Sequence, residues 1–231
     1  MKQTLGILGG IGSAAGVHLA NRLVQIAQEA GARHDADFPE FILYNLPLVG
    51  MDETGIIDGG PVKRQLHEAF QRLNAWKCDY VLVACNTVHC FYPDMVSWCS
   101  GKVLNMVDLA CEAAAKKTSS VGVLCSATTR KIGLYQTALE ARGATAVMVT
   151  DEEQKFLNKA IADVIRGEYN DRLGVCTAIR GQFERGAKLV LVGCTELSCL
   201  EINFAEGCFA APEVVDAATV ALQHAFALLS K

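Results

Sequence analysis

Two short segments, each an aliphatic run that stops at a cysteine, hold the residues best suited to chemistry. They read VLVACNTVHC (81–90) and VLVGCTELSC (190–199), and a small polar residue follows the first cysteine of each. A thiol between the end of a strand and the start of a helix lies beside exposed N–H groups and the positive end of the helix dipole, which favour the thiolate. Cys85 and Cys194 are therefore the candidate reactive thiols.

Two reactive thiols on opposite sides of one substrate can move a proton from one face of a carbon atom to the other. One cysteine, as thiolate, removes the α-proton of an amino acid, and the other, as thiol, returns a proton on the opposite face. The roles exchange in the reverse reaction. Because an α-carbon is a weak acid, a dry site and oriented donors must stabilise the charge that develops. The pattern predicts a two-base racemase.

The elements that must position these thiols alternate between short aliphatic strands and longer amphipathic helices, which is typical of parallel sheets covered on both faces. The predicted strands are 4–10, 38–46, 80–86, 120–126, 145–149 and 188–194. The predicted helices include 14–30, 62–76, 154–166, 172–185 and 216–229. In open sheets of this kind, ligands bind beyond the carboxyl ends of the strands, which is where both cysteines fall.

The second half of the chain repeats the layout of the first. One common offset aligns both the aliphatic runs and the cysteines of the two segments, and LGILGGIG (5–12) is similar to VGVLCSAT (121–128). We therefore expect an α/β protein of two pseudo-symmetric, Rossmann-like halves, each with a parallel sheet. Residues 1–112 would carry Cys85, residues 113–231 would carry Cys194, and the active site would lie in the cleft between them. The final helix could cross back to the first half.

Several motifs give the sequence a resemblance to the aspartate/glutamate racemase superfamily, on the aspartate racemase side. They are LGILGGIG (5–12), CNT (85–87), SATT (126–129) with Tyr135 after it, and GCTE (193–196). Ile11 stands where the family usually has methionine, and Glu196 stands where glutamate racemases typically have histidine. The resemblance covers nearly the whole chain and implies a cofactor-independent amino-acid racemase for aspartate or glutamate, with Cys85 and Cys194 as the catalytic pair.

The resemblance also implies substrate contacts outside the catalytic pair. Asn86, Thr87 and Thr195 would bind the α-carboxylate, and Ser126 and Thr129 would form a carboxylate-binding loop.

Three further features of the sequence bear on the substrate. The backbone N–H groups around Gly10, Ile11 and Gly12 are expected to face a substrate carboxylate. Lys155 corresponds to a family lysine that reaches the distal carboxylate. Glu196 has three open interpretations: a charge that favours the helix dipole, a ligand of the substrate ammonium, or a group that tunes Cys194.

The loop NLPLVGMDETG (45–55) departs from the family pattern. Many aspartate racemases carry an arginine here, and this loop has Pro47 but no arginine. One bidentate carboxylate ligand is therefore missing, which affects the side-chain specificity more than the reaction type. A decarboxylase or isomerase on the same scaffold, or an amino-acid-binding regulator without catalysis, are the alternatives. The retained cysteine pair argues against each of them.

No cofactor is expected. The glycines of GILGGIGSAAG (6–16) are spaced one residue wider than a dinucleotide motif, and no Schiff-base lysine is identifiable. The Cys-x4-Cys pairs are spaced more widely than most structural zinc ligands.

The expected partner is a small amino acid. The formal net charge of −4 comes without a long basic run, so neither nucleic acid nor a membrane surface is expected as a partner. The short apolar amino terminus indicates a buried strand rather than a signal peptide, and a cytoplasmic location follows as the expectation. The other cysteines are expected to be reduced core residues. The resemblance makes a homodimer a further expectation.

Overall fold

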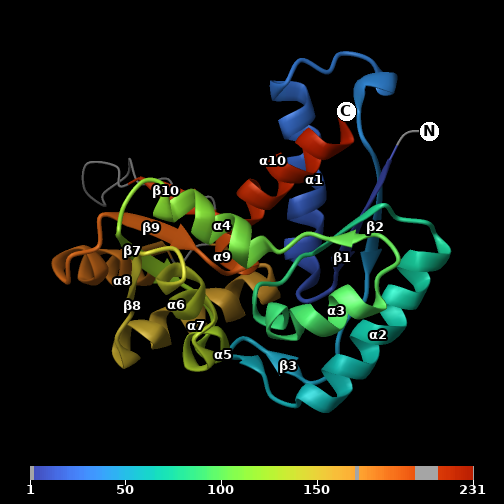
Figure 1. Ribbon diagram of the computed structural model, residues 1–231. Helices are drawn as coiled ribbons and strands as arrows, with labels where there is room; N and C mark the ends of the chain where they lie inside the picture. The colour runs from blue at the N-terminus through green and yellow to red at the C-terminus, as the bar shows by residue number, and fades with distance from the viewer. Residues whose placement is uncertain (1–2, 170–171, 201–212, 231) are drawn as a thin grey trace.

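Each half of the chain forms one four-stranded parallel sheet, and the two sheets have the same strand order (Figure 1). This computed structural model describes residues 3–169, 172–200 and 213–230. The first sheet has the order β2 (Glu40–Asn45), β1 (Thr4–Gly9), β5 (Tyr80–Val83) and β6 (Lys102–Val103). The second has the order β8 (Thr145–Met148), β7 (Ser120–Leu124), β9 (Leu189–Val192) and β10 (Val214–Asp216). The expected α/β architecture of two similar halves is confirmed.

The side chains of each strand alternate between two hydrophobic cores. One core is shared by the two sheets, and the other, here called the outer core, belongs to one sheet alone. In β1, Leu5 and Ile7 enter the shared core and Leu8 enters the outer core of the first sheet. In β9, Leu191 enters the shared core while Val190 packs in the outer core of the second sheet. Successive side chains of a strand point to opposite faces, so a continuous apolar run fits a sheet that is covered on both sides.

The shared core joins the halves through helices from both ends of the chain. Its helices are α1 (Ser13–Glu29), α4 (Met106–Ala115), α6 (Leu134–Glu140) and α10 (Ala217–Leu229). The last of these packs against both α1 and α4, and Figure 1 shows α10 in red lying beside the blue α1. The carboxyl-terminal helix therefore crosses back onto a helix of the first half. The expected boundary between residues 112 and 113 falls inside α4.

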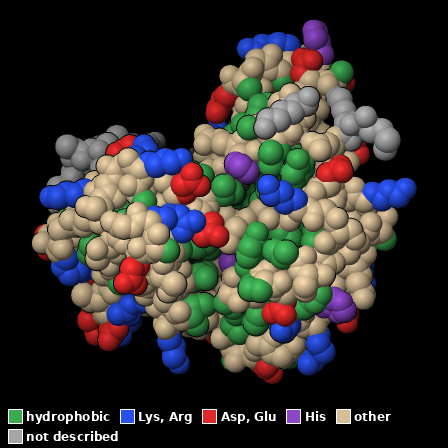
Figure 2. Space-filling model, viewed as in Figure 1, with side chains coloured by type: hydrophobic (Ala, Val, Ile, Leu, Met, Phe, Trp, Pro, Cys, Tyr) green, Lys and Arg blue, Asp and Glu red, His purple; other side chains and the backbone are tan. Residues whose placement is uncertain are grey.

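The outer faces of the sheets carry separate helices. The first sheet is covered by α2 (Gly59–Ala75) and α3 (Tyr92–Trp98), and the second by α7 (Asp151–Arg166) and α8 (Arg172–Glu184). Shorter elements are α5 (Ala127–Ile132), α9 (Thr195–Ser198) and the 3-10 helices η1 (Asp35–Asp37) and η2 (Thr87–Phe91). On the face shown in Figure 2, hydrophobic side chains gather along the middle, and charges of both signs are spread over either side.

The loop after β2 folds into a small antiparallel hairpin of β3 (Met51–Asp52) and β4 (Gly55–Ile56). This hairpin reaches the second half, because the Thr128 backbone N–H at the start of α5 donates to the Thr54 carbonyl over 2.8 Å. The contact requires Gly55, whose φ is +116° and where a Cβ would lie 2.6 Å from Thr128. The hairpin is thus a direct bridge between the halves.

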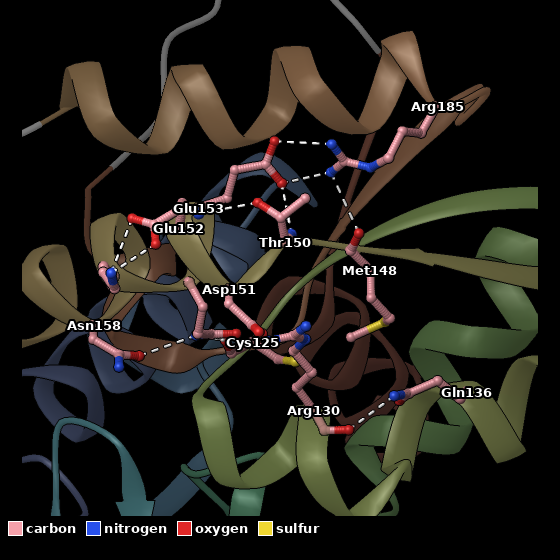
Figure 3. A network of polar contacts seen from close by, with 12 residues as sticks. Cys125, Arg130, Gln136, Met148, Thr150, Asp151, Glu152, Glu153, Asn158 and Arg185 are labelled. Atoms are coloured by element: carbon pink, nitrogen blue, oxygen red, sulfur yellow. Dashed lines mark hydrogen bonds and ion pairs between the residues drawn. The ribbon is translucent and has the colours of Figure 1, made fainter.

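The start of α7 is fixed by a network of polar contacts (Figure 3). Thr150 and Glu153 form a capping box, in which each side chain accepts from the backbone N–H of the other residue. The guanidinium of Arg185 donates to the Glu153 carboxylate over 2.9 Å and ties α7 to the end of α8. Arg130 of α5 pairs with Asp151. These contacts fix the helix that later contributes to the site.

The predicted long strands and helices are confirmed, while the shortest elements were not anticipated. The edge strands β6 and β10 and the β3–β4 hairpin have two or three residues each. One cysteine also differs from expectation: Cys176 is disulfide-bonded rather than reduced. Eight others are free thiols. Among the described residues, no helix is both long and apolar enough to span a bilayer.

Candidate active site

Both candidate thiols line one cavity of about 340 Å³ between the two halves of the chain. Cys85 follows β5 and Cys194 follows β9, which are equivalent strands of the two sheets. Six of the predicted contact residues line the same cavity: Gly10, Ile11, Gly12, Thr87, Ser126 and Glu196. The cavity is completed by Leu48, Met51, Asp52, Glu53, Gly55, Ile161 and Ile165.

The Cys85 thiol is held in its protonated form by its surroundings. Its residue is 6% exposed, and burial raises the thiol pKa to about 12, with a further contribution from the negative charge of Glu196. Backbone N–H groups of Val88 and Thr87 and the Thr87 side chain act in the opposite direction and favour the thiolate. These donors belong to η2, so the predicted helix start is present as a 3-10 helix.

The Cys194 thiol is also buried near Glu196, and in addition it forms a hydrogen bond with that carboxylate. Burial raises its pKa well above the ordinary value, and the charge of Glu196 and a hydrogen bond to it raise it further. The Cys194 Sγ lies 3.2 Å from Glu196 Oε2, to which it donates. Backbone N–H groups of Leu197 and Glu196 in the short helix α9 favour the thiolate but are outweighed. The helix starts favour the thiolates as expected, but the pKa of each thiol is nevertheless raised, because removal from water has the larger effect.

Glu196 ties the glycine turn of the first half to the thiol of the second. Its Oε1 accepts from the Gly12 backbone N–H over 2.9 Å, while Oε2 accepts from Cys194 and from the Thr195 hydroxyl at 3.3 Å. The Gly12 N–H therefore serves the protein's own carboxylate. In this structure the Gly12 N–H is engaged by Glu196, and the substrate contact expected of the glycine turn stays a prediction.

Three hydroxyl groups form a closed triangle between the halves. Thr87 Oγ1 lies 3.0 Å from Ser126 Oγ, Ser126 Oγ lies 3.0 Å from Thr129 Oγ1, and the two threonine oxygens are 2.9 Å apart. Ser126 also caps α5 by accepting from the Thr129 backbone N–H. Thr87 and Ser126 line the cavity, whereas Thr129 is fully buried behind them.

Two further predicted residues are not among those that line the cavity. The Asn86 Oδ1 accepts from the Tyr135 hydroxyl over 2.6 Å, and the buried Asn86 Nδ2 has no hydrogen-bond partner within the described ranges. The Thr195 hydroxyl donates to the Ala84 carbonyl over 3.2 Å, a contact between the two halves. Asn86 retains an unused donor next to Cys85, whereas the Thr195 hydroxyl is engaged by the protein.

Lys155 is not brought to the cavity. Its ammonium group is exposed on the first turns of α7 and pairs with Glu152 over 2.7 Å. The same helix reaches the cavity later in its length, through Ile161 and Ile165. The described lining of the cavity contains no Lys, Arg or His.

The contribution of the β3–β4 hairpin was not predictable from the sequence pattern. This segment brings Met51, Asp52, Glu53 and Gly55 to the cavity. The adjacent acidic residues were visible in the sequence, but only the fold shows that the loop turns toward the thiols. His89 belongs to η2. It is buried beside Cys85, with Nδ1 2.8 Å from the Cys85 carbonyl and Nε2 3.3 Å from the Met106 nitrogen, and burial lowers its pKa.

The polar groups of the cavity are not arranged as a metal centre. Over the residues that the structure describes, no three or more His, Cys, Asp or Glu side chains are grouped so that they could hold a metal ion. The cavity offers two thiols, the hydroxyls of Thr87 and Ser126, and carboxylates. Groups of these kinds can donate protons, accept protons and form hydrogen bonds to a small polar ligand.

Comparisons with known proteins agree with this arrangement. The chain is 22% identical over 198 residues to the broad specificity amino-acid racemase RacX of Bacillus subtilis (strain 168), covering 85% of this chain and 86% of that protein. Its fold is similar to Picrophilus torridus aspartate racemase, with a TM-score of 0.79, 23% identity, and 97% and 94% of the two chains covered.

A second group of similar structures comes from glutamate racemases. The fold matches glutamate racemase isoform RacE1 of Bacillus anthracis with a TM-score of 0.65 and 16% identity, covering 98% of this chain and 81% of that one. The model of the Asp/Glu/Hydantoin racemase family matches residues 8–225, which is nearly the whole chain. Two equivalent sheets, a thiol after the same strand of each, and this family match lead to one conclusion: the chain belongs to the Asp/Glu/Hydantoin racemase family.

Proposed function

We propose that this protein is a cofactor-independent amino-acid racemase, an isomerase, in which Cys85 and Cys194 are the two acid/base groups. The observation that carries the proposal is that both thiols line one cavity and come from equivalent strands of two pseudo-symmetric sheets. A substrate held between such thiols presents one face of its α-carbon to each. The thiolate takes the α-hydrogen as a proton, and the opposite thiol supplies the proton that completes the inverted product.

The raised thiol pKa values fit this chemistry when the substrate is included. Glu196 contributes to raising the pKa of both thiols. A substrate ammonium group placed beside Glu196 neutralises that carboxylate and lowers the cost of forming a thiolate. The thiolate then forms with the substrate present. Of the three interpretations of Glu196 from the sequence, we propose the two that concern the site: it binds the ammonium group and tunes Cys194.

Donors for the α-carboxylate are available next to Cys85. The Thr87 and Ser126 hydroxyls line the cavity, and the Asn86 Nδ2 is a buried donor without a partner in the described structure. Thr129 holds both hydroxyls in place from behind. Such preorganised donors also stabilise the negative charge that spreads onto the carboxylate when the α-proton leaves.

Aspartate and glutamate are the substrates that the resemblance implies, and they remain a prediction. Either would bring a second carboxylate into a cavity whose described lining contains Asp52, Glu53 and Glu196 and no basic side chain. The cavity therefore supports the racemase reaction more strongly than it supports an acidic side chain.

The decisive experiment measures α-hydrogen exchange in deuterated water, with both enantiomers of the common amino acids and no added cofactor. Cys85→Ser and Cys194→Ser should each reduce racemisation by about a hundredfold to ten-thousandfold, because a hydroxyl is a much weaker acid than a thiol. Each variant should still exchange the α-hydrogen of one enantiomer, and the two variants should differ in which one. Cys99→Ser, a change of a free cysteine outside the cavity, should retain activity.

Three results would contradict the proposal. Substantial racemisation by either single variant would show that a thiol is dispensable. Binding of amino acids without α-hydrogen exchange would favour a non-catalytic regulator. Release of carbon dioxide, or isomerisation of a substrate without an α-hydrogen, would assign the cavity to a decarboxylase or another isomerase.

A further inference from the structure

We propose, on the basis of the racemase function above, that the substrate is an amino acid with a long aliphatic side chain that ends in a cation. The described cavity lining has three carboxylate side chains and no Lys, Arg or His. The two stretches between the described ranges, 170–171 and 201–212, contain no Lys, Arg or His in their sequence. The side-chain charges of the lining are thus all of one sign.

The three carboxylates differ in the hydrogen bonds that they accept within the protein, and one of them accepts none from a described residue. Glu196 accepts from Gly12 and Cys194 and lies with the catalytic thiols. Asp52 closes the turn of the hairpin, where its Oδ1 accepts from the Thr54 backbone N–H at 2.7 Å and from the Thr54 hydroxyl at 2.6 Å. Glu53 has neither a hydrogen bond nor an ion pair to any described residue, and it is one of the residues that line the cavity. Glu53 is therefore the carboxylate available to the side chain of the substrate, beside Glu196, to which we assign the α-ammonium group.

The walls of the cavity suit the stem of such a side chain. Five aliphatic side chains contribute to the lining: Ile11, Leu48, Met51, Ile161 and Ile165. Lysine and arginine bury their methylene stems along apolar surfaces and keep the charged end beside polar groups. A cavity with aliphatic walls and a free carboxylate on the hairpin offers both surfaces to one substrate. A short acidic side chain gains little from the walls and is repelled by the carboxylates.

An independent observation indicates where the negative end of the substrate goes. Asn86 is buried, and its Nδ2 donor has no partner among the described residues. With the hydroxyls of Thr87 and Ser126, this donor provides for one carboxylate next to Cys85. The charged residues of the cavity lining are all carboxylates, which accept hydrogen bonds and therefore suit ammonium or guanidinium groups. An amino acid with a cationic side chain matches this set of donors and acceptors, and one with an acidic side chain does not.

Nearby cations are not in a position to reverse this charge balance. Lys155 is paired with Glu152 on the surface of α7, and Arg130 is paired with Asp151. Like charges that are brought together in a binding site repel each other and suppress the binding of the wrong partner. Discrimination against aspartate and glutamate thus follows from repulsion as well as from the missing ligand.

The test compares kcat and KM for lysine, ornithine, arginine, norleucine, methionine, aspartate and glutamate, measured as α-hydrogen exchange and as racemisation. The basic amino acids should have the highest kcat/KM, and norleucine, the neutral analogue of lysine, should have a KM at least about tenfold higher than lysine. Glu53→Gln should raise the KM for lysine by a similar factor, with little change in kcat and little change for norleucine. Glu53→Arg should shift the preference toward glutamate. Glu68→Gln, an exposed change on α2 outside the cavity, is the matched control.

The outcomes separate this inference from the racemase function itself. If acidic or neutral amino acids are turned over faster than basic ones, the racemase function stands and the cationic substrate class is wrong. If Glu53→Gln leaves the ratio of lysine to norleucine unchanged, the role of Glu53 is wrong. If no amino acid exchanges its α-hydrogen in the unmodified protein, the racemase function fails and the substrate class fails with it.

Discussion

At the scale of single residues, Glu196 has the most consequences, because one side chain contacts both halves of the chain. It accepts from Gly12 in the first half and from Cys194 in the second. Its negative charge contributes to the raised pKa of Cys194 and also of Cys85. A single carboxylate thus influences the proton affinity of both thiols, and the ammonium group that we propose it binds would act on both at once.

Glu196→Gln should make both thiols more acidic and the enzyme less active. The substitution removes a charge that raises both pKa values, so thiol alkylation should begin at a lower pH than in the unmodified protein. Racemisation should fall by at least about tenfold, because the ammonium group loses a charged ligand. The measurement is the rate of iodoacetamide labelling of Cys85 and Cys194 against pH, read by mass spectrometry, with Glu68→Gln as the control. Labelling that shifts to higher pH would contradict the assigned role.

The residues of the site were only partly predictable from the sequence. Cys85 and Cys194 were found because each ends an aliphatic run and is followed by a polar helix start, a local pattern. The direction of their pKa shifts was not found, because it depends on burial and on Glu196, which reach the thiols through tertiary structure. Lys155 was assigned to the substrate site by resemblance alone. The sequence at the start of α7 does not indicate which face of the helix lies toward the cavity.

At the scale of elements, the β3–β4 hairpin is the part of the site that has the fewest stabilising contacts within itself. It has two residues in each strand and depends on contacts with α5. An isolated two-stranded hairpin is marginally stable in water. Its position over the thiols therefore rests on the close approach of Gly55 to Thr128, which leaves no room for a side chain.

Gly55→Ala should displace the hairpin while leaving the two sheets intact. A Cβ at position 55 would lie 2.6 Å from Thr128, and the φ of +116° is unfavourable for alanine. We expect KM to rise about tenfold or more, with a loss of about 1–2 kcal/mol in the free energy of unfolding. Gly31→Ala is the matched control, because its φ is +105° and nothing lies within 4 Å of the added Cβ. Equal effects of both substitutions on KM would show that the contact with Thr128 is unimportant.

Elements with a long hydrophobic pattern were predictable from the sequence. The strands around Ile7 and Leu191 were predicted because their apolar runs are continuous, which requires helices on both faces. The edge strands β6 and β10 were not predicted, because a strand of two or three residues shows no hydrophobic periodicity. The hairpin was not predicted for the same reason, although its acidic residues are visible in the sequence.

At the scale of the whole molecule, buried thiols make the folded state sensitive to alkaline pH. Burial raises the pKa of Cys85, Cys111 and Cys125 to about 12 each. Between the ordinary thiol pKa of 9.0 and this value, the folded state binds more protons than the unfolded state. Stability therefore falls as pH rises through this window.

Urea unfolding from about pH 9 to about pH 11 should show a steady decrease in the midpoint. Cys111→Ala removes one buried thiol of the shared core, distant from the cavity lining, and should make the decrease shallower while lowering stability at neutral pH. A midpoint that is constant over this range in the unmodified protein would show that the buried thiols ionise as readily in the folded chain as in the unfolded one.

The unequal surroundings of the two thiols, with Cys194 bonded to Glu196 and Cys85 facing Thr87, lead to a restriction on the kinetics. The two enantiomers of a free amino acid have equal free energy, so their equilibrium ratio is unity. The Haldane relation then makes kcat/KM identical for the two directions at every pH, however different the thiols are. In the steady-state kinetics of the unmodified enzyme, the asymmetry is visible as kcat and KM values that differ between the enantiomers by the same factor. A pseudo-symmetric fold with unlike thiols thus gives each enantiomer its own kcat and KM, while the net preference for either hand stays at zero.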